Sequence, residues 1–142
     1  LAMAAHVRIF SENARVGLPE TSLGVIPGYG GTQRLAQIAG KGRAMEMILS
    51  AKMIDAATAL NYGITNKVVP LGELIETAKK MAKKIIKNSP MAIAKAIQCI
   101  NANYTSGVDG LAFEVNAFGD CFGTPDFKEG TSAFLEKRKA DF

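Results

Sequence analysis

The chain has 142 residues, 48% of them hydrophobic and 21% charged, which favours one folded domain with a substantial core and excludes a disordered chain. Its net charge of +4 suits an anionic ligand, either nucleic acid or a small polyphosphate, and no apolar run is long enough to span a bilayer. Two widely spaced cysteines and a single histidine exclude a disulfide framework and a zinc site, so we expect a reducing, cytoplasmic location and no metal.

The first half of the chain mixes short strands with short helices. Alternating apolar residues predict strands, and Asp55 and Thr32 are typical helix N-caps, with Gly40 and Gly63 as stop signals. Between Pro19 and Gly31 the glycines and prolines predict irregular backbone. The expected strands cover residues 5–10, 14–17 and 64–69, and the expected helices cover 33–39, 42–50 and 56–62.

The second half is predicted to be helical throughout. Residues 73–87 carry apolar side chains at helical spacing on one side and five lysines on the other. No aromatic residues interleave with these lysines, so we interpret them as a solvated face and expect no nucleic-acid partner. Further helices are expected from Pro90, over 108–121 and from about Pro125.

So few short strands do not make a stable sheet alone. The sequence also begins at Leu1 inside an apolar stretch, with no leading loop. We therefore expect an α/β chain that lacks preceding strands or pairs with another chain.

The most informative stretch is the glycine-rich run from Gly24 to Arg34. Its glycines allow close backbone approach to a ligand, and the helix that follows offers free N–H groups. The spacing fits neither a Walker loop nor a dinucleotide fingerprint, so a functional loop and a plain turn stay equally open. Glu20, just ahead of it, suits a general acid or base, although the residues alone favour a solvated loop glutamate.

Four strings, residues 1–3, 9–12, 14–20 and 23–35, resemble the enoyl-CoA hydratase (crotonase) family, and residues 128–139 look like its C-terminal helix. The resemblance implies a spiral of ββα units followed by a helical region that packs subunits into homo-trimers and often hexamers. It also implies that the chain is the C-terminal half. Residues 1–70 would then be the end of the spiral core with the active-site loop, and residues 71–142 the helical region for trimerisation and the coenzyme A channel.

The same resemblance implies a lyase of fatty-acid metabolism that hydrates 2-trans-enoyl-CoA to 3-hydroxyacyl-CoA. No cofactor is implied, because coenzyme A is part of the substrate. Glu20 matches a catalytic glutamate, and Gly28 matches a residue whose backbone lies near the catalytic water. Phe118 and Phe134 match positions that line the acyl and coenzyme A channel, and Lys137 matches a lysine that meets the nucleotide.

Two alternatives stay open. In the family, the oxyanion hole and a first glutamate precede the position of Leu1, so we expect the isolated chain to be inactive. A Δ3,Δ2-enoyl-CoA isomerase shares the fold and a carboxylate base. The chain by itself could instead be a non-catalytic assembly module.

Overall fold

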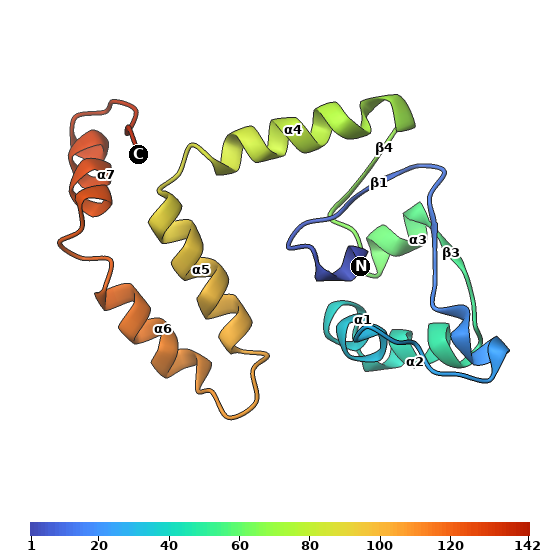
Figure 1. The fold of residues 1–142 in the computed structure, drawn as a ribbon. Coiled ribbons are helices and arrows are strands. Elements are labelled where there is room, and N and C mark those ends of the chain that lie inside the picture. The colour runs from blue at the N-terminus through green and yellow to red at the C-terminus, as the bar shows by residue number, and fades with distance from the viewer. The chain divides into compact units, whose positions relative to one another are not determined.

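The computed structural model describes residues 1–142 and divides into two compact units, residues 1–79 and 80–142 (Figure 1). The division falls inside helix α4 (Leu74–Ile85), which follows a single 3-10 turn, η3 (Leu71–Glu73). None of the helices is long and apolar enough to cross a membrane. The boundary expected from the sequence, after residue 70, lies nine residues before the observed one, after residue 79, and the roles expected of the two parts stay predictions.

The N-terminal unit contains two separate two-stranded sheets. Strand β1 (Ile9–Ser11) pairs in parallel with β4 (Lys67–Val69), and β2 (Arg15–Val16) pairs antiparallel with β3 (Ile54–Asp55). The expected β-spiral therefore does not appear as a continuous sheet, because the chain contributes only these short strands.

The prediction of a strand over 5–10 was wrong for most of its length. Residues 2–4 form a 3-10 turn, η1 (Ala2–Ala4), and the strand begins only at Ile9. The reason is the partner: β4 begins at Lys67, opposite Ile9, and just before it the Asn66 side chain accepts the N–H of Arg8 at 2.9 Å. A strand extends only as far as another backbone pairs with it.

The core of the N-terminal unit lies between its three helices, α1 (Gly31–Ala39), α2 (Lys41–Leu49) and α3 (Ala56–Asn61). Asp55 caps α3 as predicted, since its carboxylate accepts the N–H of Thr58 at 2.8 Å. The predicted Thr32 cap was wrong: α1 begins at Gly31 after Gly30, whose φ of 74° is favourable only for glycine. The buried core residues are Leu35, Ala39, Ala44, Met47, Ile54, Ala59 and Ile64.

Gly17 is required where β2 leaves its partner. A Cβ atom there would lie 2.8 Å from the carbonyl oxygen of Lys52 and 2.5 Å from the sulfur of Met53. We expect Gly17→Ala to destabilise the protein by about 1–3 kcal/mol, because the backbone contact cannot relax as the methionine can. Chemical denaturation of the variant beside the parent measures this, and equal stability of the two would contradict it.

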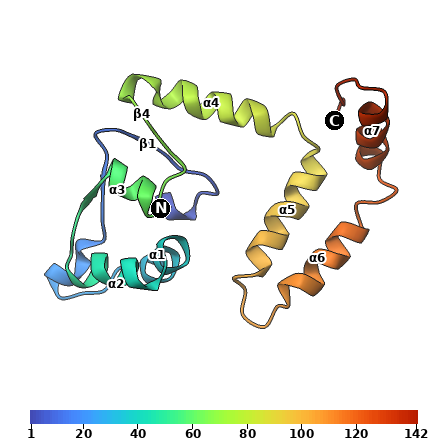
Figure 2. The ribbon, with the colours of Figure 1, turned by 180° about the vertical axis from the view of Figure 1, so that it is seen from behind.

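The C-terminal unit consists of the end of α4 and three further helices, α5 (Pro90–Ala102), α6 (Gly110–Gly119) and α7 (Pro125–Leu135). Side chains of Ser89, Asp109 and Thr124 cap the last three by accepting N–H groups of their first turns. Helices α5 and α6 run side by side in both views (Figures 1 and 2).

The buried residues of this unit are all small. They are Ser89, Ala102, Ala117 and Ala133, whereas many large apolar side chains are exposed, among them Leu111 at 79% and Val115 at 70%. The unit therefore has no core of large side chains of its own.

Candidate active site

A short 3-10 helix, η2 (Pro19–Leu23), follows β2 and carries the candidate acid–base residue Glu20. Pro19 starts this helix, where a missing N–H costs nothing. The hydroxyl of Thr21 donates to the carbonyl of Ile48 at 2.6 Å and ties η2 to the end of α2. The carbonyl of Glu20 accepts the N–H of Val25 at 3.3 Å, which ties the backbone of Glu20 to the start of the glycine-rich loop.

Glu20 has a buried carboxylate oxygen with no partner. Its side chain is partly buried, and atom Oε2 is shielded from solvent without a hydrogen bond. The solvated position that the residues alone favoured is therefore wrong for this oxygen. An unpaired buried acceptor is costly and calls for a reason, such as a catalytic role. A carboxylate held in this way is available to take or give a proton.

The glycine-rich loop that follows is irregular and ends in strained backbone. Tyr29 has a φ of 51°, a left-handed conformation unfavourable for a residue with a side chain, and its side chain is fully exposed. Gly28, just before it, is exposed and accepts the N–H of Gly31 at 2.8 Å, while its own N–H has no backbone partner. A Cβ on Gly28 would meet nothing within 4 Å. Strain of this kind is concentrated at functional segments.

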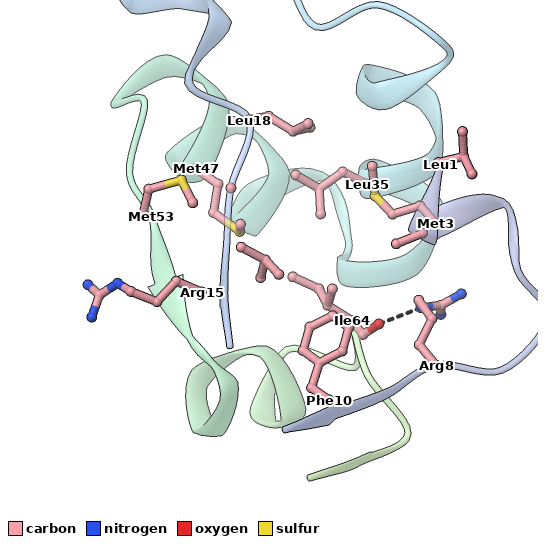
Figure 3. A pocket seen from close by; sticks show the side chains of 13 residues that line it. Leu1, Met3, Arg8, Phe10, Arg15, Leu18, Leu35, Met47, Met53 and Ile64 are labelled. Carbon is pink, nitrogen blue, oxygen red and sulfur yellow. Dashed lines mark hydrogen bonds between the residues drawn. The ribbon is translucent and has the colours of Figure 1, made fainter. Parts of the chain in front are cut away.

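A mostly apolar cavity of about 300 Å³ lies inside the same unit (Figure 3). Figure 3 shows Phe10, Leu35 and Met47 gathered around it, with the guanidinium of Arg15 pointing away. Leu18 lines the cavity but Glu20 does not. The cavity is therefore separate from the candidate carboxylate.

The other predicted site residues belong to the C-terminal unit. Phe118 on α6 is 65% exposed and rests edge-on against Phe122, with ring centroids 5.0 Å apart. Phe134 on α7 is 83% exposed, and its carbonyl accepts the N–H of Lys137 at 3.3 Å. The structure thus brings Phe134 and Lys137 together in the C-terminal unit, while Glu20 and Gly28 both belong to the N-terminal unit.

Sequence reasoning missed a carboxylate clasp at the end of the chain. Glu129 on α7 accepts both terminal guanidinium nitrogens of Arg138, at 2.6 and 2.9 Å, and the N–H of Asp141 at 2.8 Å. We call these three residues the Glu129 clasp. The Arg138 hydrogen bonds, followed by that of Asp141, lower the pKa of Glu129 to about 2. The available signal was the pair of opposite charges, Glu129 and Arg138, close to the C-terminus.

The titration of Glu129 offers a direct check of this clasp. We expect its carboxyl to titrate near pH 2, not at its ordinary value of 4.5. Because the folded pKa is lowered, the clasp contributes its full stability above about pH 4.5 and loses it as the pH falls toward 2. Carbon-13 NMR of the side chain against pH measures this, with Glu129→Gln to assign the signal. A midpoint near the ordinary value would contradict the clasp.

No group of three or more His, Cys, Asp or Glu side chains lies together as a metal site would require. In the N-terminal unit, the features that could take part in a reaction are the carboxylate of Glu20 and the open loop at Gly28. Together they suit proton transfer to or from a ligand that reaches the loop.

The chain folds like solved proteins of the crotonase type, an α/β fold with few strands and many helices. It superposes on the crystal structure of an enoyl-CoA hydratase from Bacillus anthracis with a TM-score of 0.93 at 41% identity, covering 99% of this chain and 55% of that one. Residues 1–142 also match the sequence model of the family described as Enoyl-CoA hydratase/isomerase. The chain therefore belongs to the enoyl-CoA hydratase/isomerase family.

Among curated proteins, the chain is 48% identical to a short-chain-enoyl-CoA hydratase of Clostridium acetobutylicum, over 99% of this chain and 54% of that protein. It is 43% identical to a crotonyl-CoA hydratase of Syntrophomonas wolfei, over 100% of this chain and 55% of that protein. The chain thus spans about half the length of these relatives. These fractions do not support the expectation that the chain is the C-terminal half, because they do not say which part of each relative is matched.

Proposed function

We propose that the protein hydrates a 2-trans-enoyl-CoA to the 3-hydroxyacyl-CoA, with Glu20 as one of two acid–base carboxylates. The observation that carries this is the buried, unpartnered Oε2 of Glu20 on η2. Membership of the family supports the reaction class, and two relatives at 48% and 43% identity carry hydratase names. The reaction belongs to the whole protein, of which this chain matches about half by comparison with its relatives.

The proposed chemistry needs two proton transfers. One carboxylate takes a proton from water as the water oxygen bonds to the β carbon, and the electrons of the double bond move onto the thioester as an enolate. A carboxylic acid then gives a proton to the α carbon. Two carboxyl groups close together do not both ionise easily, so one is kept protonated and the roles divide. No metal or cofactor takes part in this sequence.

The remaining predicted residues would bind the substrate. Gly28 has open space above it and a free N–H, which suits the approach of water or the thioester. Phe118 and Phe134 expose aromatic surface that suits the acyl and pantetheine chain. Lys137 carries an exposed ammonium group that suits the coenzyme A phosphates.

Loss of enoyl-thioester absorbance on mixing crotonyl-CoA with the intact protein tests the proposal. We expect hydration by the intact protein and none by the isolated 142-residue chain. Offering a 3-enoyl-CoA in parallel separates hydratase from isomerase, the second candidate, which the description of the matching family also covers. Faster conversion of the 3-enoyl-CoA would replace the hydratase proposal by the isomerase one.

A trimeric or hexameric assembly is proposed from the C-terminal unit. Its helices expose large apolar side chains, such as Leu111 at 79% and Leu135 at 79%, and bury small ones only. Exposed apolar surface of this kind is typical of an interface. Sedimentation of the 142-residue chain at micromolar concentration tests whether the chain assembles, although we expect it to be catalytically inactive. A monodisperse monomer would count against the proposed assembly.

A further inference from the structure

The three basic residues that follow α7 differ in what they contact. Arg138 is fully engaged: its terminal nitrogens bond Glu129, and its Nε donates to Glu136 at 2.6 Å. Lys137 and Lys139, on either side, form none of the ion pairs in the structure. Arg138 is therefore neutralised by two carboxylates, and the charge left for a ligand is that of its neighbours.

Lys137 lies in a turn that its own backbone does not favour. Its φ is 54°, and the N–H of Arg138 reaches back to the carbonyl of Ala133 at 3.0 Å. Helices often end in this way, but usually with glycine at the left-handed position. A lysine there needs contacts elsewhere to hold it.

The Glu129 clasp supplies such contacts. Glu129 lies before the turn, and Arg138 and Asp141, which it bonds, lie after it. A second contact closes the same loop, since a Cβ on Gly130 would lie 3.3 Å from the ring of Phe142. The residues that follow the exposed Lys137 are thus fastened back to α7, which precedes it.

We propose that Glu129 is a positioning residue for binding the coenzyme A nucleotide: it keeps Arg138 paired and holds the left-handed turn that presents Lys137 to the phosphates. The inference rests on the proposed function, in which Lys137 meets that nucleotide. Glu129 itself does not touch the substrate. Its effect should therefore appear in affinity and not in turnover.

The test uses the intact protein with Glu129→Gln, and Glu136→Gln as the matched control. The control removes the carboxylate of Glu136 from the guanidinium of Arg138. It leaves intact the hydrogen bonds that Glu129 accepts from the terminal nitrogens of Arg138 and from the N–H of Asp141. We expect Glu129→Gln to weaken the Kd for free coenzyme A and raise the KM for crotonyl-CoA about tenfold, the effect of one lost charge-assisted hydrogen bond, with kcat unchanged. Glu136→Gln should change either constant less than about twofold.

Two further readouts distinguish positioning from loss of fold. Crotonyl-pantetheine, a thioester without the nucleotide, should be hydrated equally well by the parent and by Glu129→Gln. Glu129→Gln should also add nothing in a Lys137→Gln background, because both variants then remove one interaction. An equal loss on both thioesters, additive effects, or an unchanged Kd for coenzyme A would overturn the proposal.

The affinity and hydration readouts also separate this inference from the proposed function. Tenfold weaker coenzyme A binding by Glu129→Gln, in a protein that hydrates no crotonyl-CoA, would support the clasp and overturn the hydratase proposal. Hydration with no effect of Glu129→Gln on either constant would do the reverse.

Discussion

Glu20→Gln is expected to lower kcat for crotonyl-CoA hydration by about 10³-fold, within the range for loss of a positioned acid–base group. The amide keeps the size of the side chain but neither takes nor gives a proton at the reacting carbon. KM should change less than about threefold, since the interaction is made in the transition state. Stopped-flow and steady-state absorbance measurements on the intact protein separate the two constants.

Stability gives an independent check on Glu20. Its Oε2 is buried without a partner, so the neutral amide should leave the melting temperature unchanged or raised. Glu12→Gln is the matched control, because that side chain belongs to the same unit and is exposed without an ion pair. Full hydration activity in Glu20→Gln would remove Glu20 from the mechanism, and an equal loss in Glu12→Gln would point to a general charge effect.

Helices of the C-terminal unit were predictable because their signals are local. The proline at the start of α5 and the spacing of apolar residues in α4 both act within a few residues. The structure confirms these helices, with ends that shift by a few residues from the predicted ranges. The side chains of Ser89, Asp109 and Thr124 complete each start.

Features that depend on distant residues were not predictable in the same way. Strand β3 has only two residues and exists because β2, far earlier in the chain, pairs with it. The strand expected over 5–10 was shortened by the position of its partner, β4. Both are tertiary effects that no window of the sequence contains.

The residues of the candidate site could be found from the sequence, but their burial and long-range contacts could not. Glu20 and Gly28 were found through resemblance, since a glutamate beside glycines is usually a plain loop. The observation that favours a catalytic role for Glu20 is its unpaired Oε2, and the burial of that atom depends on the fold. The Glu129 clasp was missed because Glu129 and Arg138 are nine residues apart and meet only after the turn at Lys137.

Gly28→Ala is expected to lower hydration activity by about 10²-fold, the scale of a misplacement of about 1 Å at a reacting centre. Within this chain the added methyl would meet nothing within 4 Å, and φ at Gly28 is not in the left-handed region. The folded protein should therefore keep its stability or gain up to about 1 kcal/mol from the less flexible unfolded chain. A loss of activity would then come from the methyl group entering the open space above the loop, where we place water and the thioester.

Gly42→Ala is the control for this substitution. Gly42 is exposed on α2, and a Cβ there also meets nothing within 4 Å, but it lies outside the glycine-rich loop. Alanine at Gly42 should raise stability by up to about 1 kcal/mol and leave hydration unchanged. Melting temperature and kcat/KM measured on both variants decide the matter. If Gly28→Ala hydrated crotonyl-CoA like the parent, the glycine would serve the turn alone, and the loop would have to hold its ligand elsewhere.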